Sequence, residues 1–409
     1  PSARAQWVTQ SFALKAGWNA VYLHVDASHD TLENLIGTDP DNPIIEVWLW
    51  APPASTLQFV QSPQLPVENA QWLSRVRNSQ DTQPLQRLPG NVACLVRVAT
   101  NVANYTWTLK GRPVPPSYEW TTTGLNFLGF PTVPTGAPSF ENFFAHAPDL
   151  RLNAEIYRYN GGDRGPGNPT RVYALRTTFV NRGQAFWIRA GTVFNRYFAP
   201  FETVISGSGV RYGDNLNTVG FRLRNLTATN LGVTVRLLAS ETPPSGQTSI
   251  AGTPPLWVRG ALNTTNLTYN YSPLLTSGTH VWTLRPQGQD GSDIEVVLAL
   301  DRTAMGGEPG QLFAGVLRFT DALGFSQVDV PVSALAADTS GLWVGAAAVQ
   351  QVGQYLKSYA TDASGALATS NGAYVVSSLN TDMASVPREF PLRLIVHNPG
   401  AGGQARLLQ

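Results

Sequence analysis

Apolar and polar residues alternate with a period of two over many short stretches of this chain, which is the pattern of half-buried β-strands. Phe221 and Leu223 alternate with polar residues, and Val233, Val235 and Leu237 do the same in the next stretch. Residues 20–25 instead form a nearly continuous apolar run, as expected for a strand covered on both faces. Helical periodicity never extends beyond one or two turns. The pattern therefore predicts a mainly β protein.

Four segments recur in the same order within the first half of the chain, and an internal repeat decides the architecture before any other signal. Residues 17–21, 31–36, 46–50 and 93–97 match residues 124–128, 139–144, 155–159 and 185–189. We therefore predict a tandem duplication of one β-rich module, with the first copy over 6–120 and the second over 121–202. The difference in residue number between matched segments becomes smaller after residue 50 of the first copy, which indicates extra residues in that copy. We assign them to a predicted surface loop at 55–88, whose shorter counterpart in the second copy is 161–170.

Each copy is expected to contain one short helix and one matched pair of opposite charges. Thr31 and Ser139 occupy positions where a hydroxyl can cap a helix of one to two turns. Arg97 and Arg189 end matched apolar strands, so their stems can pack along the sheet while the charged heads reach a carboxylate. The matched acids Glu46 and Glu155 are the predicted partners.

Paired aromatic residues give the only candidate ligand-binding residues. Trp48 and Trp50 in the first copy, and Tyr157 and Tyr159 in the second, are two positions apart, so both rings of a pair lie on one face of a strand. Packing in a core or on a sheet is the favoured interpretation. The alternative is an exposed aromatic platform that stacks on a sugar ring.

The second half of the chain predicts a different β domain. Short apolar stretches separated by turn residues are typical of an immunoglobulin-like β-sandwich, here assigned to 203–336. A further β module, incomplete at its end, is predicted for 337–409. Two long loops are expected at 243–255 and 263–275. The predicted strands are 220–226, 232–239, 280–284, 293–300, 312–320 and 326–333.

The Gly-Trp-Asn opening at 17–19, the capped helix, the aromatic strand and the Arg-terminated strand resemble a GWN-type module. Such modules occur in large secreted multidomain surface proteins of Gram-negative environmental bacteria, followed by immunoglobulin-like domains and often by LamG domains downstream. The resemblance covers both halves of 6–202 and implies secretion and a surface role. It implies no catalytic residues. The second copy has Leu125 where the first has Trp18, which weakens the case that Trp18 itself is essential to the module.

Composition excludes several classes of partner. The 28 basic and 27 acidic residues give a net charge of +1 and form no basic run, so nucleic acid is not an expected partner. No apolar run is long enough to span a membrane. The single cysteine, Cys94, is expected to be a buried apolar residue. Of the five histidines, only His24 and His29, five residues apart, have a spacing that a metal site could use. We interpret both as solvated turn residues, and neither a metal nor a cofactor is predicted.

Hydrolase and nucleotide-binding motifs are absent from the sequence, so the chain is not expected to be an enzyme. A glycosidase needs only two carboxylates that the fold brings together, and strand acids such as Glu155 and Asp293 keep that alternative open. Ala3-Arg4-Ala5 has the pattern of a signal-peptide cleavage site. We predict a secreted protein without catalytic activity that forms a structural or adhesive part of a stalk, fibre or adhesin. Its expected partners are other copies of itself or other surface proteins. The alternative is the carbohydrate-binding region of a larger polysaccharide-handling protein, with a glycan as partner.

Overall fold

The mainly β fold class is confirmed by a computed structural model of the chain, which divides into two compact units, Pro1–Ala337 and Asp338–Gln409. The predicted cleavage site at residues 3–5 lies outside the described residues. The further division of the first unit at 120 and 202 stays a prediction. The structure describes residues 6–37, 39, 41–51, 71–79, 83–117, 125–165, 167–189, 197–265, 268–336, 341–348 and 389–396.

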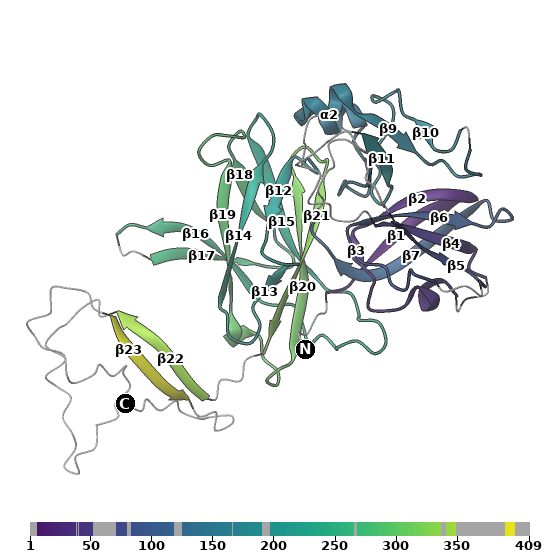
Figure 1. Cartoon of the computed structure of the whole chain (residues 1–409). Coiled ribbons are helices and arrows are strands. Elements are labelled where there is room, and N and C mark those ends of the chain that lie inside the picture. Colours follow the sequence, from purple (N-terminus) through teal and green to yellow (C-terminus); the bar gives the residue numbers. More distant parts are fainter. Residues whose placement is uncertain are drawn as a thin grey trace, which may run out of the picture. The chain divides into compact units, whose positions relative to one another are not determined.

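The first copy is a sandwich of two antiparallel sheets (Figure 1). One sheet has the order β1-β7-β3 and the other the order β2-β6-β4-β5. Side chains alternate along β6, so Cys94, Val96 and Val98 point into the core between the sheets, as predicted for Cys94. The elements are β1 (Val8–Lys15), β2 (Gly17–Leu23), β3 (Val25–Asp26), η1 (Glu33–Gly37), β4 (Ile44–Ala51), β5 (Gln71–Val76), β6 (Val92–Val98) and β7 (Asn104–Pro113).

In the described residues of the second copy there is one sheet, of order β8-β11-β9-β10. Helical turns cover one face of this sheet, where Phe140, Phe143 and Phe144 are fully buried. Larger side chains thus fill space that the first copy fills with a second sheet. The elements are β8 (Asn126–Leu128), α1 (Phe140–Phe143), η3 (Phe144–His146), α2 (Pro148–Asn153), β9 (Glu155–Arg158), β10 (Thr170–Arg171) and β11 (Phe186–Arg189).

Strand order and register are the same in the two four-stranded sheets. In the first copy Asn19 pairs with Val96, and Glu46 pairs with Arg97. In the second copy the matched residues pair in the same way, Asn126 with Ile188 and Glu155 with Arg189. The predicted helix caps are also present, because the hydroxyls of Thr31 and Ser139 each accept a hydrogen bond at 3.3 Å from the backbone N–H three residues on.

A β-sandwich of two five-stranded sheets follows the copies, with orders β12-β14-β19-β16-β17 and β13-β21-β20-β15-β18. In the first sheet, strands β12, β14, β19 and β16 occupy the A, B, E and D positions of an immunoglobulin-like sandwich. In the second sheet, β21, β20 and β15 occupy the G, F and C positions. Strands β17 and β18 are inserted between the D and E positions. The elements are β12 (Phe201–Val204), β13 (Val210–Arg211), β14 (Thr218–Asn225), β15 (Leu231–Ala239), β16 (Leu256–Asn263), β17 (Thr268–Leu274), β18 (His280–Leu284), β19 (Asp293–Leu300), η4 (Arg302–Ala304), β20 (Leu312–Asp321) and β21 (Gln327–Leu335).

Two predicted loops contain strands, and these predictions were wrong. Strand β17 lies inside the predicted loop 263–275, and β5 lies inside the predicted loop 55–88. Each forms by pairing with a neighbouring strand, β16 and β4 respectively. Neither strand has the alternating burial that makes a strand visible in the sequence.

The second compact unit contains one described pair of antiparallel strands, β22 (Gly341–Ala348) and β23 (Glu389–Val396). Gly341 pairs with Val396, and Ala348 pairs with Glu389. The predicted β character of this region therefore holds for its described residues. No described helix of the chain is long and apolar enough to cross a membrane.

Candidate functional site

The four predicted aromatic residues are half-buried rather than fully exposed. Trp48, Trp50 and Tyr159 pack against the core that joins the two copies. Trp48 Nε1 donates a hydrogen bond of 2.9 Å to Glu46, and Tyr157 Oη donates one of 3.3 Å to Glu155. Because these bonds occupy matched positions, each copy fixes its first aromatic ring with the acid two residues earlier on the same strand.

An aromatic cluster, formed by Trp50, Trp72, Phe127 and Trp187, lies between the sheets of the two copies. Phe127 and Trp187 stack at a centroid distance of 4.4 Å. Trp50 meets Trp187 edge-on at 5.1 Å and lies 5.0 Å from Trp72. These are the distances at which aromatic pairs stabilise a core. Trp50 therefore has a packing role, and contact of this ring with a glycan stays a prediction.

Both predicted ion pairs of the duplicated module are present. Arg97 Nη1 lies 2.7 Å from Glu46 Oε1, and Arg189 Nη1 lies 3.9 Å from Glu155 Oε2. The Arg97 guanidinium also lies 5.9 Å from the centre of the Trp18 ring. Each copy thus places a charge pair at the same corner of its sheet.

Gly17, the first residue of the Gly-Trp-Asn motif, allows the second copy to approach β2. Its φ is +80°, and a Cβ added there would lie 2.4 Å from the carbonyl oxygen of Gly162. The close approach lets Trp18 N donate to Gly162 O at 2.8 Å, while Gly162 N donates to Ala16 O at 2.7 Å. Only glycine fits this position, since any side chain would separate the two copies.

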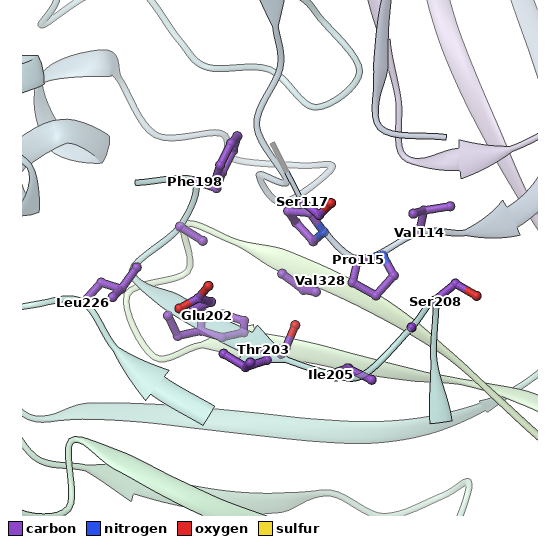
Figure 2. A pocket seen from close by; sticks show the side chains of 15 residues that line it. Val114, Pro115, Ser117, Phe198, Glu202, Thr203, Ile205, Ser208, Leu226 and Val328 are labelled. Carbon is purple, nitrogen blue, oxygen red and sulfur yellow. The ribbon is translucent and has the colours of Figure 1, made fainter. Parts of the chain in front are cut away.

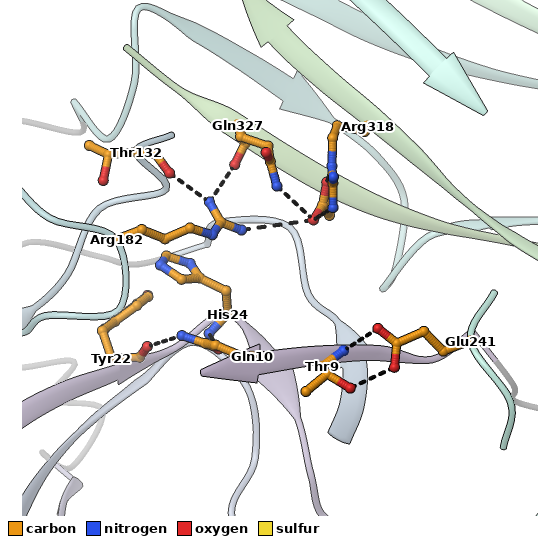
Figure 3. Close-up of polar contacts among 10 residues, drawn as sticks. Thr9, Gln10, Tyr22, His24, Thr132, Arg182, Glu241, Arg318 and Gln327 are labelled. Atoms are coloured by element: carbon orange, nitrogen blue, oxygen red, sulfur yellow. Dashed lines mark hydrogen bonds and ion pairs between the residues drawn. The ribbon is translucent and has the colours of Figure 1, made fainter. Parts of the chain in front are cut away.

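A buried junction centred on Arg182 connects the second copy to the sandwich (Figure 3). Arg182 Nη1 donates to the carbonyl oxygens of Thr132 at 2.9 Å and Gln327 at 2.8 Å. Its other terminal nitrogen lies 3.9 Å from Asp329, which also forms two hydrogen bonds, 2.8 and 3.0 Å long, with Arg318. Two arginines therefore share one carboxylate, and all three modules meet here because the first copy contributes His24.

His24 is buried beside this junction, so the prediction that it is a solvated turn residue was wrong. Figure 3 shows its imidazole next to the Arg182 side chain. Gln10 holds the segment in place, because its amide accepts from His24 N and donates to Tyr22 O, both at 2.8 Å. Burial, and next the Arg182 charge, hold the pKa of His24 well below its usual value. The imidazole is thus neutral near pH 7. The other predicted turn histidine, His29, is half-buried with its ring 4.7 Å from that of Trp7.

The outer face of the β12-β14-β19-β16-β17 sheet carries a ladder of ion pairs across its strands. Asp293 accepts from Arg222 at 2.8 Å and from Arg224 at 2.9 Å. Arg224 also reaches Glu202 at 3.3 Å, and Arg259 pairs with Glu295 at 2.6 Å. The glycosidase candidates Asp293 and Glu155 are thus both ion-paired with arginines.

A cavity of about 610 Å³ lies between the chain at 114–117 and strand β12 (Figure 2). Apolar side chains, including Val114, Phe198, Ile205 and Leu226, form much of its lining. Glu202 is the one charged residue of this lining, and it is the Glu202 of the ion-pair ladder. The described lining therefore offers an apolar surface with a single acid, not a pair of carboxylates.

Comparisons with known proteins provide no identity for the chain. No protein-family model matches it, and no curated protein matches it. One matching solved structure, described as the crystal structure of the CupB6 tip adhesin from Pseudomonas aeruginosa, has a TM-score of 0.20 and 10% sequence identity, covering 82% of this chain and 92% of that chain. A TM-score this low demonstrates neither a common fold nor a common role. The resemblance to GWN-type surface proteins stays a prediction.

Proposed function

We propose that this chain is a non-catalytic structural or adhesive part of a secreted cell-surface or extracellular assembly. The observation that carries the proposal is the buried Arg182 junction, which joins the second copy to the sandwich within one compact unit. A stalk or adhesin must transmit force through its modules without bending at each boundary. The charge-assisted hydrogen bond from Arg182 to Gln327 crosses between two modules and adds to that rigidity, since it is stronger than a neutral hydrogen bond.

Packing of the first strand onto the sandwich supports the same role. Trp7 is fully buried against Leu312 and Ala314, and its backbone N–H donates to Ser240 at 2.8 Å. Thr9 forms two further hydrogen bonds with Glu241, 2.9 and 2.6 Å long (Figure 3). The N-terminal strand of the first copy is therefore fixed to a domain that begins about two hundred residues later.

Surface display tests the proposal directly. When the full chain is displayed on a non-adherent bacterium, more cells should stay attached to a surface under flow. Alternatively, the cells should clump through cell–cell contact and therefore sediment faster. A Glu155→Gln variant should adhere equally well, because a non-catalytic role does not use this carboxylate. Retention equal to that of cells displaying an unrelated β-sandwich would contradict the proposal, as would release of sugar from a polysaccharide that depends on Glu155.

A carbohydrate-binding role is the second candidate, and it has less support. Its predicted rings are half-buried, and three of them pack against the shared core. Calorimetric titration with soluble polysaccharides would test this role, with Trp48→Ala and Tyr157→Ala as the variants that remove a partly exposed ring from each copy.

A further inference from the structure

Three exposed large apolar side chains, Leu262, Tyr269 and Tyr271, lie on a projecting hairpin of β16 and β17, whose described residues 259–265 and 268–272 we call the arm. Figure 1 shows this hairpin extending beyond the body of the sandwich. Tyr269 is 45% exposed and Tyr271 is 41% exposed, and Leu262 lies opposite Tyr269. Apolar surface gathered in one place on a polar molecule marks an interaction site more often than isolated residues do.

The arm has little support from its own chain. Strand β17 lies at the end of its sheet, so its outer edge has no strand partner among the described residues. The described residues 260–265 and 268–272 of the arm are all exposed. A hairpin of two strands without a core is only marginally stable in water. Adding a third strand would pair the free backbone groups and cover the apolar side chains.

The usual protection of an edge strand is missing from the outer part of β17. Proteins block such edges with lysine, proline or a bulge. Here the bulge lies between Arg259 and Leu262 on the inner strand β16, and Pro273 lies at the base, paired with Trp257. The four residues Tyr269–Ser272 contain neither a charge nor a proline. This segment is therefore an unprotected edge.

Its charges favour a copy of itself as the partner. Since Tyr269–Ser272 carries no charge, pairing two such strands brings no like charges together. The one basic residue in the sequence of the arm, Arg259, forms an ion pair with Glu295 at 2.6 Å. Its guanidinium also lies 4.5 Å from the centre of the Tyr269 ring, so a sugar would find one face of that ring already occupied.

We propose that the β17 edge binds the same edge of a second copy of this chain as an antiparallel strand pair. The two sheets then join into one continuous sheet across a two-fold axis. Tyr269 and Tyr271 of both copies share one face, where aromatic cross-strand pairs are stabilising. This inference rests on the proposed structural role and names the surface that assembly uses.

Sedimentation of the purified full chain over a range of concentrations tests the pairing. The wild type should show a reversible monomer–dimer equilibrium. Tyr271→Lys should weaken it at least about tenfold, because, in the register that places Asn270 opposite Asn270 of the second copy, the two introduced lysines lie diagonally across the joined strands on one face and repel each other. Tyr173→Lys is the matched control, since Tyr173 is 79% exposed on the second copy and lies outside the arm.

Cysteine cross-linking locates the contact. Asn270→Cys should form a dimer-linking disulfide under mild oxidation, because cross-strand Cα atoms lie within the range that a disulfide spans. The native Cys94 is buried and does not interfere. A cysteine at Val281, on the edge strand β18 of the other sheet, should remain unlinked.

The outcomes separate this inference from the proposed function. A wild type that stays monomeric at all concentrations overturns the inference, and so does a dimer that Tyr271→Lys and Tyr173→Lys affect equally. In either case, adhesion by displayed chains would leave the proposed function standing. Adhesion absent while the β17 dimer forms would overturn the adhesive role alone.

Discussion

Replacing Arg182 with methionine should destabilise the first compact unit far more than an ordinary surface substitution. The change keeps an unbranched side chain about as long as the aliphatic stem of arginine but removes the guanidinium. The Arg182 side chain is 16% exposed, and Asp329, its ion-pair partner, is 7% exposed. The junction is therefore mostly shielded from water, and the groups that Arg182 contacts have few alternative partners.

The expected cost follows from the bonds that are lost. Two carbonyl oxygens, of Thr132 and Gln327, lose a charged donor. A hydrogen bond to a charged group contributes about 1.5–3 kcal/mol. The gain from returning a buried guanidinium to water offsets part of that sum, and Asp329 keeps its bonds to Arg318. We expect a net loss of about 2–4 kcal/mol in the free energy of unfolding.

Urea unfolding of the full chain, followed by circular dichroism and tryptophan fluorescence, measures this loss. Arg176→Met is the matched control, because Arg176 also lies in the second copy and pairs with Glu141 at 3.0 Å, but is 84% exposed. An exposed ion pair contributes at most about 1 kcal/mol. Equal losses for Arg182→Met and Arg176→Met would refute the claim that the junction holds the modules together.

Three further predictions concern the buried histidine, the helix caps and the aromatic cluster. The pKa of His24 is lower in the folded chain than in the unfolded chain. The free energy of unfolding should therefore be highest above about pH 6.5 and fall as the pH is lowered below that value, because the unfolded chain then binds the proton more readily. His24→Gln should reduce this pH dependence, as measured by urea unfolding at pH 7.5 and at pH 5. Ser139→Ala should lower the free energy of unfolding by about 0.5–1 kcal/mol, because the hydroxyl accepts a long cap bond of 3.3 Å. Trp50→Ala should lower it by about 2–3 kcal/mol, because a half-buried ring that contacts Trp72 and Trp187 is lost.

Each of these predictions has an outcome that contradicts it. Unchanged acid sensitivity in His24→Gln would assign the pH dependence to other groups. A cost above about 2 kcal/mol for Ser139→Ala would mean that the hydroxyl does more than cap one turn. A Trp50→Ala variant of wild-type stability that loses glycan affinity would favour the platform interpretation over packing.

Sequence periodicity predicted the alternating strands β14 and β15 to within two residues of their bounds. The predicted strands 280–284 and 293–300 are β18 and β19 with the same bounds. Strand β17 was missed because Thr268, Asn270 and Ser272 alternate with exposed tyrosines, so no apolar face marks it as a strand. Strand β17 forms because it pairs with β16, and this pairing has no signal within the sequence of β17 itself.

The duplicated blocks predicted the Glu46 and Glu155 ion pairs, because one repeat constrains the other. The junction had no such signal. Arg182 and Asp329 lie far apart in the sequence, and each is an isolated charge with no repeated counterpart. His24 was misjudged for a related reason: an adjacent turn suggested solvent, whereas residues of the second copy cover it. Contacts between modules are a property of three-dimensional packing that local patterns do not encode.

The two copies bury matched faces against each other, and this limits how the module can be multiplied. Ala20 and Leu95 of the first sheet occupy the positions that Phe127 and Trp187 occupy in the second, and all four belong to one core. Each of these matched faces covers the other, so both are used once the two modules have met. A third tandem module would find no free apolar face of this kind, and a chain that lengthens by this route must add its modules two at a time.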